Sequence, residues 1–440
     1  MSKYYRSIPL IAAVLLGFSL TTTADAKPTQ VSQYQGNKQL VQGLYSRDLD
    51  AASYFQQGVM RYERGHFQEA EQHFRKALQF DPSITMAYYL LGNALFEQGK
   101  TELATEQYRI AIGLNPNLAE AHYNLGLMQY RQGNVGGAIS SYQRALSLNP
   151  DSAPAYYNLG LAYDTQDRQE EAIAEYQQAI SLKPDYAVAQ YNLALLRAKR
   201  DETQPAINNF QQAVNSNPEL LEGHYQLGLL QLKQGRLEEA EDSLKKATKL
   251  DSEFTPAHYQ LGIVLAKQGD FKGAIDRFRW VTKLEPDHVD AYKHLGAALI
   301  EDGKYEEAAL VLESAVQLEP TDALTYYNLG VALQQQGEYE EAALAYQESI
   351  FLNPNQPQAF YNLGVSLALS ERQSEAKPFL LQARNLFIEE GNLEKVDELD
   401  EYMQELEKSQ INEFEDTIPP EVESEESELI ESTPVEVTEP

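Results

Sequence analysis

The stretch that decides the fold of this chain reads Ala153-Pro-Ala-Tyr-Tyr-Asn-Leu-Gly-Leu-Ala-Tyr163 and, after a polar break, Glu171-Ala-Ile-Ala-Glu-Tyr-Gln-Gln-Ala-Ile-Ser-Leu-Lys-Pro184. Its proline, glycine and alanine recur every 34 residues without an insertion, and only Ser252 and Ala194 interrupt the series. The three series are Pro82, Pro116, Pro150, Pro184, Pro218, Pro286, Pro320 and Pro354; Gly58, Gly92, Gly126, Gly160, Gly228, Gly262, Gly296, Gly330 and Gly364; and Ala70, Ala104, Ala138, Ala172, Ala206, Ala240, Ala274, Ala308, Ala342 and Ala376. A fixed period of this length indicates small units that stack to bury a shared core.

Each unit contains two segments with helical spacing of apolar residues, separated by a polar break. The break often reads Gln-Gly, as at Gln98-Gly99, Gln132-Gly133 and Gln268-Gly269, and glycine tolerates the left-handed backbone that ends a helix. The proline near the end of each unit stops the second segment, because proline lacks an amide donor and restricts the residue before it. The sequence therefore predicts an all-α array of helix–turn–helix hairpins.

Small residues recur where the two helices of a hairpin must approach closely. In the unit quoted above these are Gly160 in the first helix and Ala172 and Ala179 in the second, with the large residues Leu159 and Tyr176 beside them. Protein interiors are close-packed, so larger side chains at the small positions would have no room.

These residues resemble the tetratricopeptide repeat, whose pattern places an aromatic residue, Leu-Gly, a turn glycine, alanine, a second aromatic residue, alanine and proline at these spacings. The resemblance covers ten repeats over residues 51–390. It implies a right-handed superhelical solenoid whose concave groove binds extended peptides or partner helices.

The pattern departs most in the fifth repeat, where Ala194 and Asp201 replace both glycines, and we expect that turn to be less regular. The fourth repeat has Asp167 at its turn. The tenth repeat has Glu371 at the turn and Ile388 where proline would end the second helix.

The first 26 residues have the pattern of a secretory signal peptide. Lys3 and Arg6 precede a largely apolar core from Ile8 to Leu20, and small residues lead to an expected cleavage after Ala26. The alternative is an uncleaved anchor, but the core is shorter than the ~20 residues that span a bilayer. We expect a periplasmic or secreted protein with no membrane span after cleavage, and a polar linker at residues 27–50.

The C-terminal region continues beyond the repeats in two parts. Residues 391–408 repeat apolar residues at helical spacing with an acidic outer face, which predicts a helix that caps the last hairpin. Residues 409–440 contain prolines and many acidic residues but no lysine or arginine, so we expect an acidic disordered tail. Whether this tail binds the groove stays open.

Composition excludes several functions. The formal net charge of the 440 residues is −31, and a nucleic-acid partner would require a concentrated basic surface. The chain has no cysteine, which rules out disulfides, thiolate metal sites and a cysteine nucleophile.

The sequence contains no recognisable catalytic motif. It lacks an HExxH pair, a GxSxG elbow, a phosphate-binding glycine loop and a dinucleotide fingerprint. His122, His224 and His258 stand where other units have tyrosine or phenylalanine, which favours packing over metal binding. We therefore expect no enzyme, with no catalytic residues, no metal site and no cofactor.

The candidate binding residues form two ladders on or beside the first-helix stripe that packing does not require, which in the fourth repeat is Pro154, Asn158, Leu161 and Thr165. Amides offer a donor and an acceptor that suit a peptide backbone, and tyrosine adds rigid contact area with a polar tip. An alternative is that these residues only pack between hairpins. The ladders, interrupted at Lys293 and His294, are the amides Asn124, Asn158, Asn192, Gln226, Gln260, Asn328 and Asn362 and the tyrosines Tyr123, Tyr157, Tyr191, Tyr225, Tyr259 and Tyr327.

A basic run, Lys199, Lys233 and Lys267, repeats at the end of three successive first helices. A cation there favours the helix dipole, and the alternative is an acidic ligand in the groove. The family's clamp for the carboxylate of chaperone tails is incomplete, because Tyr89, Pro154 and Asn158 stand where it needs basic residues.

Together these features favour a non-catalytic scaffold that binds a protein or extended peptide in its groove and helps assemble a complex outside the cytoplasm. Two alternatives stay open: a substrate-docking subunit of an enzyme complex, and a self-associating structural protein.

Overall fold

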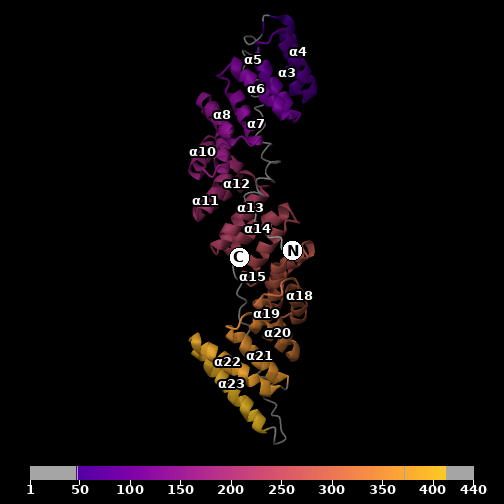
Figure 1. Cartoon of the computed structure of the whole chain (residues 1–440), viewed down its shortest axis with the longest axis vertical. Helices are drawn as coiled ribbons and strands as arrows, with labels where there is room; N and C mark the ends of the chain where they lie inside the picture. The colour runs from indigo at the N-terminus through magenta and orange to yellow at the C-terminus, as the bar shows by residue number, and fades with distance from the viewer. Residues whose placement is uncertain (1–45, 47, 371, 413–440) are drawn as a thin grey trace. The chain divides into compact units, whose positions relative to one another are not determined.

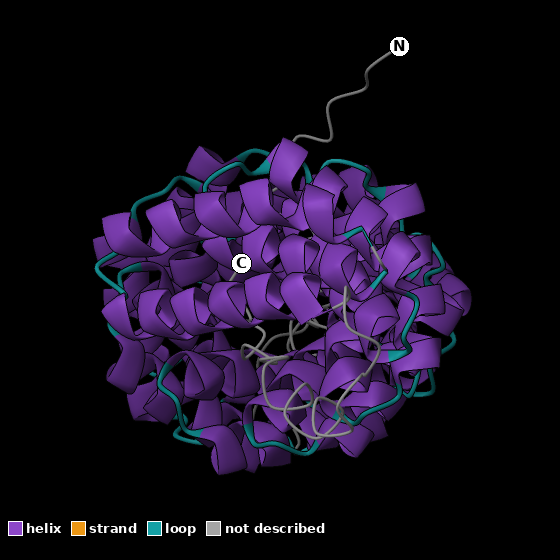
Figure 2. Ribbon diagram, turned by 90° about the horizontal axis from the view of Figure 1, so that it is seen from below, coloured by secondary structure: helices purple, strands orange, loops and turns teal. Residues whose placement is uncertain are grey.

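The computed structural model describes residues 46, 48–370 and 372–412, and every regular element in them is an α-helix (Figure 2). The predicted signal peptide and most of the predicted linker and acidic tail lie outside the described residues. The all-α prediction is confirmed.

Helices pair along the chain into ten hairpins (Figure 1). The first helices are α3 (Leu49–Glu63), α5 (Thr85–Glu97), α7 (Ala119–Arg131), α9 (Ala153–Thr165), α11 (Ala187–Lys199), α13 (Leu221–Lys233), α15 (Thr255–Lys267), α17 (Val289–Glu301), α19 (Ala323–Gln335) and α21 (Pro357–Leu369). The second helices are α4 (Phe67–Phe80), α6 (Thr101–Leu114), α8 (Val135–Leu148), α10 (Gln169–Leu182), α12 (Thr203–Ser216), α14 (Leu237–Leu250), α16 (Phe271–Leu284), α18 (Tyr305–Leu318), α20 (Tyr339–Leu352) and α22 (Gln373–Glu389). A final helix, α23 (Leu393–Asn412), follows them.

The chain divides within α13 into two compact units, one that ends at Gly223 and one that begins at His224. Within each unit the second helices contact the first helix of their own hairpin and that of the next, as α8 contacts α7 and α9 and α16 contacts α15 and α17.

The two helices of a hairpin meet at the glycine of the first helix. A Cβ atom on Gly126 would lie 2.6 Å from Cε1 of Tyr142, and one on Gly92 would lie 2.6 Å from Cε1 of Tyr108. Real Cβ atoms do not approach so closely, so the glycine is required for the ring to lie against the helix. Both tyrosines are fully buried.

Two turns contain aspartate at the position where seven other hairpins have glycine, and both adopt the same backbone. Asp167 and Asp201 have φ of 57°, in the left-handed region that Gly99 occupies with φ of 74°. Aspartate visits this region more readily than most residues because its short polar side chain bonds locally. The expectation of a less regular turn in the fifth repeat is therefore wrong.

The tenth hairpin ends differently from the others. Its second helix, α22, has 17 residues, against 14 in α20, because Ile388 stands in place of the helix-ending proline. Gly391 with φ of 75° then turns the chain into α23. Val396 and Leu399 of α23 are buried, and Arg384 of α22 donates two hydrogen bonds to Asp400, of 2.6 and 2.8 Å. The helix continues to Asn412, which corrects the boundary predicted at residue 408.

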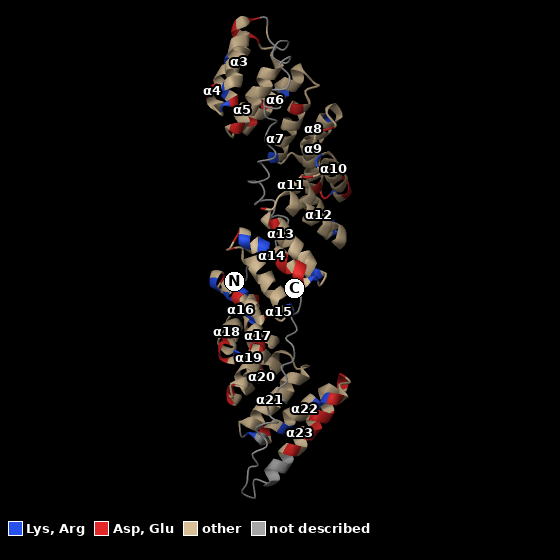
Figure 3. Cartoon of the chain, turned by 180° about the vertical axis from the view of Figure 1, so that it is seen from behind, with Lys and Arg blue, Asp and Glu red and all other residues tan. Residues whose placement is uncertain are grey.

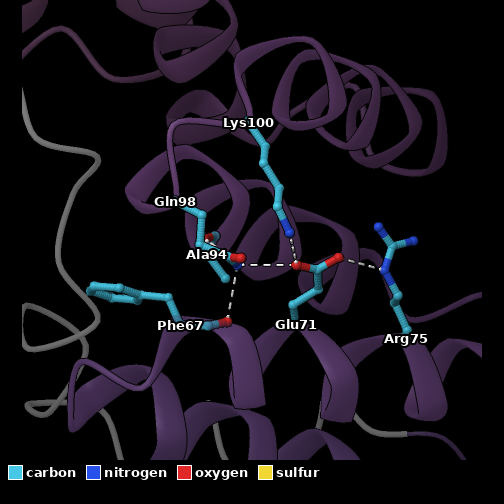
Figure 4. Close-up of polar contacts among 6 residues, drawn as sticks. All are labelled: Phe67, Glu71, Arg75, Ala94, Gln98 and Lys100. Atoms are coloured by element: carbon cyan, nitrogen blue, oxygen red, sulfur yellow. Dashed lines mark hydrogen bonds and ion pairs between the residues drawn. The ribbon is translucent and has the colours of Figure 1, made fainter.

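Polar side chains join consecutive hairpins at the end of the first helix (Figure 4). Gln98 Nε2 donates to Glu71 Oε2 at 3.1 Å, and the same carboxylate forms ion pairs with Lys100 at 2.8 Å and Arg75 at 2.9 Å. Burial alone would raise the pKa of Glu71, but the hydrogen bonds from Lys100, Arg75 and Gln98 together lower it. In the C-terminal unit Gln268 Nε2 reaches Glu241 Oε2 at 3.0 Å in the same way.

Ala172→Leu tests the close approach of the two helices. Ala172 is fully buried, and its carbonyl oxygen would lie 3.2 Å from a Cβ on Gly160. We expect the variant to lower the free energy of unfolding by about 1–3 kcal/mol through overpacking. Denaturant titration measures this, and Ala174→Leu on the exposed face of the same helix is the control. An equal loss in both variants would contradict the assignment.

Glu71→Gln tests the joint shown in Figure 4. The lowered pKa means that the folded state favours the charged carboxylate, so its stabilising contribution is complete above the ordinary glutamate pKa of about 4.3. That contribution is lost as the pH falls through the lower folded-state pKa. We expect Glu71→Gln to cost about 1–2 kcal/mol at pH 7 and the difference from wild type to shrink in acid. The exposed Glu102→Gln is the control, and a difference independent of pH would contradict the prediction.

Candidate functional site

The first helices present a stripe of side chains that does not pack against the second helix of the same hairpin. In α9, Pro154 and Leu161 are half-buried and Thr165 is exposed. Asn158, the fourth residue of the predicted stripe, is only 6% exposed. The accessible part of this predicted stripe therefore consists mainly of the other three residues.

The amide and tyrosine ladders bond to each other between hairpins. Asn158 Nδ2 donates to the hydroxyl of Tyr123 at 3.0 Å and to the carbonyl of Pro154 at 2.8 Å. Asn192 Nδ2 donates to the Tyr157 hydroxyl at 3.1 Å, a residue 35 positions earlier in the sequence.

The same arrangement recurs near the other end of the chain, where Asn362 Nδ2 donates to the Tyr327 hydroxyl at 3.3 Å. Near the N-terminus the pattern changes, because Asn124 Nδ2 donates at 2.9 Å to Asn93 Oδ1, which also accepts from the Tyr108 hydroxyl at 2.8 Å.

We expected that core packing does not require the ladder residues, but most of them are buried. The buried members are Asn124, Asn158, Asn328, Asn362, Tyr123, Tyr157, Tyr191 and Tyr327. Several of their polar atoms bond to one another inside the stack, as Asn158 does to Tyr123 and Asn362 to Tyr327. Sequence reasoning missed these bonds, since they join residues about one repeat apart. Contact of these residues with a partner stays a prediction.

The remaining ladder residues are half-buried and so partly accessible to a partner. They are Asn192 in the N-terminal unit and Tyr225, Gln226, Tyr259 and Gln260 in the C-terminal unit. On α15, Pro256, Tyr259, Gln260 and Lys267 follow one another at helical spacing, which places them on one face. Pro256 and Lys267 are exposed. Burial raises the pKa of Tyr259, so its hydroxyl stays protonated at neutral pH.

Lys293 and His294 of α17 interrupt the two ladders, and their side chains contact charged and aromatic neighbours. Lys293 Nζ lies 2.6 Å from Glu319 Oε2 and 3.2 Å from Asp322 Oδ2. Burial would lower the pKa of Lys293, but the hydrogen bond to Glu319 and the charge of Asp322 raise it. The ring of His294 stacks on Phe278 with centroids 5.5 Å apart, and burial lowers the pKa of this histidine.

The three lysines of the basic run are exposed at the ends of their helices. Lys199, in the N-terminal unit, pairs with Asp167 Oδ1 at 3.4 Å. Lys233 and Lys267 lie in the C-terminal unit, at the ends of α13 and α15.

The histidines at the aromatic position are packed into the repeats. His258 is buried, its Nε2 lies 3.1 Å from the carbonyl oxygen of Ser252, and its ring contacts Trp280. His224 is buried, and Nε2 of His122 lies 3.0 Å from the carbonyl oxygen of Pro116. Within the described ranges, no three histidine or acidic side chains group in a way that would hold a metal ion.

The fold and this surface define a helical repeat protein, and family models identify it. Tetratricopeptide repeat models match residues 58–99, 92–133, 128–167 and 232–269, residues 153–186, residues 259–323 and residues 323–356, more than half of the chain together. The chain belongs to the tetratricopeptide repeat family. Repeats of this family form scaffolds for protein–protein interaction, and the chain falls in that class.

Several solved structures are similar to parts of the chain. YrrB, described as a TPR protein with an unusual peptide-binding site, is 26% identical over 42% of this chain and 96% of its own, with a TM-score of 0.41. MamA from Desulfovibrio magneticus RS-1 is 30% identical over 38% of this chain and 94% of its own, with a TM-score of 0.37. The pilF protein of Pseudomonas aeruginosa is 21% identical over 47% of this chain and 93% of its own, with a TM-score of 0.41. No curated protein matches the chain significantly.

None of the described helices combines the length and the hydropathy that crossing a bilayer requires.

Asn158→Ala tests whether the amide ladder stabilises the stack. Because the variant leaves the buried Tyr123 hydroxyl without the hydrogen bond from Asn158, we expect a loss of about 1–2 kcal/mol in the free energy of unfolding. The exposed amide variant Gln178→Ala is the control.

A double-mutant cycle with Tyr123→Phe separates the hydrogen bond from general packing. If the bond is stabilising, the two variants are non-additive by about 0.5–1.5 kcal/mol. Full additivity would contradict a direct interaction between the two side chains.

Proposed function

We propose that this chain is an exported, non-catalytic scaffold that binds partner proteins along its first helices and organises a complex outside the cytoplasm. The observation that carries the proposal is the accessible first-helix face of the C-terminal unit. There α15 contacts α17, α17 contacts α19 and α19 contacts α21, so the first helices lie side by side. Each of them presents half-buried side chains that its own hairpin does not cover.

The chemistry of this face suits a polypeptide. Gln260 offers an amide donor and acceptor, which a peptide backbone of any sequence can use. Tyr259 is held by ring contacts with Phe278 and His288, so little side-chain freedom is lost when a partner covers it. Exposed Lys267 adds a positive charge at the end of the same face.

Export rests on the N-terminal sequence. The basic residues, the apolar core and the small residues before Ala26 have the order of a cleaved secretory signal. The absence of cysteine is compatible with an oxidising compartment.

The double variant Gln260→Ala/Lys267→Ala tests the first-helix face. Neither side chain contributes to the buried core, so we expect circular dichroism and melting temperature to stay unchanged. Affinity for the partner recovered from the native envelope or culture medium should fall about tenfold, because few contacts dominate such interfaces. Titration of the purified partner measures the change.

The matched control for this test is Lys272→Ala, which removes an exposed lysine from the second helix α16. Normal binding by the double variant, or an equal loss in the control, would contradict the first-helix assignment.

Export is tested by expressing the whole chain in a bacterial host and sequencing the N-terminus of the protein from each fraction. We expect the periplasmic or secreted protein to begin at Lys27. Retention in the cytoplasm with residues 1–26 intact would contradict export.

A further inference from the structure

The second helices α18 and α20 expose large apolar side chains that the other hairpins do not have at these positions. Leu310 of α18 and Leu344 of α20 are 61% and 62% exposed, and Phe351 of α20 is 81% exposed. The position of Leu310 and Leu344 is polar or small in the seven preceding hairpins, which have Gln72, Glu106, Ser140, Ala174, Asn208, Asp242 and Asp276 there. The exposed leucines are therefore not a requirement of the repeat.

The apolar residues of α20 lie on one face. Leu344 and Phe351 are seven residues apart, two helical turns, and so point in the same direction. Ala342, Ala345, Tyr346 and Ser349 are buried and occupy the opposite side of the helix, toward the core. The face formed by Leu344 and Phe351, which we name the α20 outer face, is thus separate from the first-helix face.

The charged residues within α18 and α20 are all acidic (Figure 3). The helices α18 and α20 contain six glutamates and no lysine or arginine. Glu340, Glu341 and Glu348 are exposed beside Leu344 and Phe351, and none of the three forms a salt bridge with any residue that the structure describes. The preceding second helix α16 differs, because it carries Lys272, Arg277, Arg279 and Lys283.

We propose that the α20 outer face docks a partner protein through a basic amphipathic helix. A helix with leucine-like residues on one side would cover Leu344 and Phe351, and lysine or arginine at the edges of that side would pair with Glu341 and Glu348. This combination of an apolar stripe and flanking charge is how amphipathic helices are recognised by helical surfaces.

A second copy of the chain fits this face less well. A symmetric contact would place the same surface of both copies together. It would then bring Glu340, Glu341 and Glu348 against the same residues of the other copy, and like charges in contact repel. The chain as a whole carries a net charge of −31, which adds to this repulsion.

The test uses the whole chain and a labelled synthetic peptide of ~18 residues, about five helical turns, with leucine and lysine at amphipathic spacing. Two further peptides separate the contributions: one with the same composition in scrambled order, and one with glutamate in place of lysine. Fluorescence anisotropy at low and moderate salt gives the affinity of each. We expect the amphipathic lysine peptide to bind at least tenfold tighter than either of the other two.

The decisive variants remove the apolar and the charged parts separately. We expect Leu344→Gln/Phe351→Gln to weaken binding of the lysine peptide about tenfold, and Glu341→Gln/Glu348→Gln to weaken it and to reduce its dependence on salt. All four side chains are exposed, so both variants should keep the wild-type helical signal, and either one alone decides the question. The control Leu182→Gln removes an exposed leucine from α10, which also carries three glutamates.

Three results would overturn the proposal. The first is equal binding of the scrambled and amphipathic lysine peptides, which would show attraction by charge alone. The second is unchanged binding of the lysine peptide by either of the two variants. The third is a concentration-dependent mass of the wild-type chain that Leu344→Gln/Phe351→Gln abolishes, which would identify a second copy as the occupant.

Discussion

The packing of nearly every hairpin depends on one contact, in which a large side chain of the second helix lies against the glycine of the first. In nine hairpins a Cβ on that glycine would stand within 2.8 Å of the partner ring or leucine. The partner is aromatic at Tyr108, Tyr142 and Tyr346, and it is leucine at Leu244 and Leu312. The second-helix side chain touches the backbone of the first helix directly. This contact therefore sets the distance between the two helices of a hairpin, whatever residues lie on the surface.

This close approach explains why the amide and tyrosine side chains became part of the interior. Once the hairpins stack at a fixed spacing, the hydroxyl of Tyr123 comes within hydrogen-bond distance of Asn158 in the next hairpin. The hydroxyl of Tyr157 meets Asn192 in the same way. Asparagine and tyrosine, which suit peptide recognition, thus also bond one repeat to the next. The ladder residues that remain accessible, such as Gln260, are the better candidates for partner contact.

The period alone is enough to predict the helices, their pairing and the buried positions. Nearly every repeat has glycine at the position of Gly160, and all have alanine at that of Ala172 and a large apolar residue at that of Tyr176. It also locates the turns, although it does not show that Asp201 adopts the backbone of the glycine it replaces. The hydroxyl–amide bonds could not be predicted, since they depend on how one hairpin is superimposed on the next. The α20 outer face left a signal in the sequence, because Leu310 and Leu344 depart from seven polar or small residues at their position. The sequence alone does not tell whether these two leucines are buried in the core or exposed, and the structure shows that they are exposed.

The central claim, that partner proteins contact the first-helix face, is tested most directly by site-specific photo-crosslinking in the whole chain. A photoreactive phenylalanine analogue would replace Gln260 on the first helix α15 and, in a separate protein, Lys272 on the second helix α16. The account predicts covalent adducts with a partner polypeptide from position 260 and few or none from position 272. Adducts from position 272 with none from position 260 would contradict it.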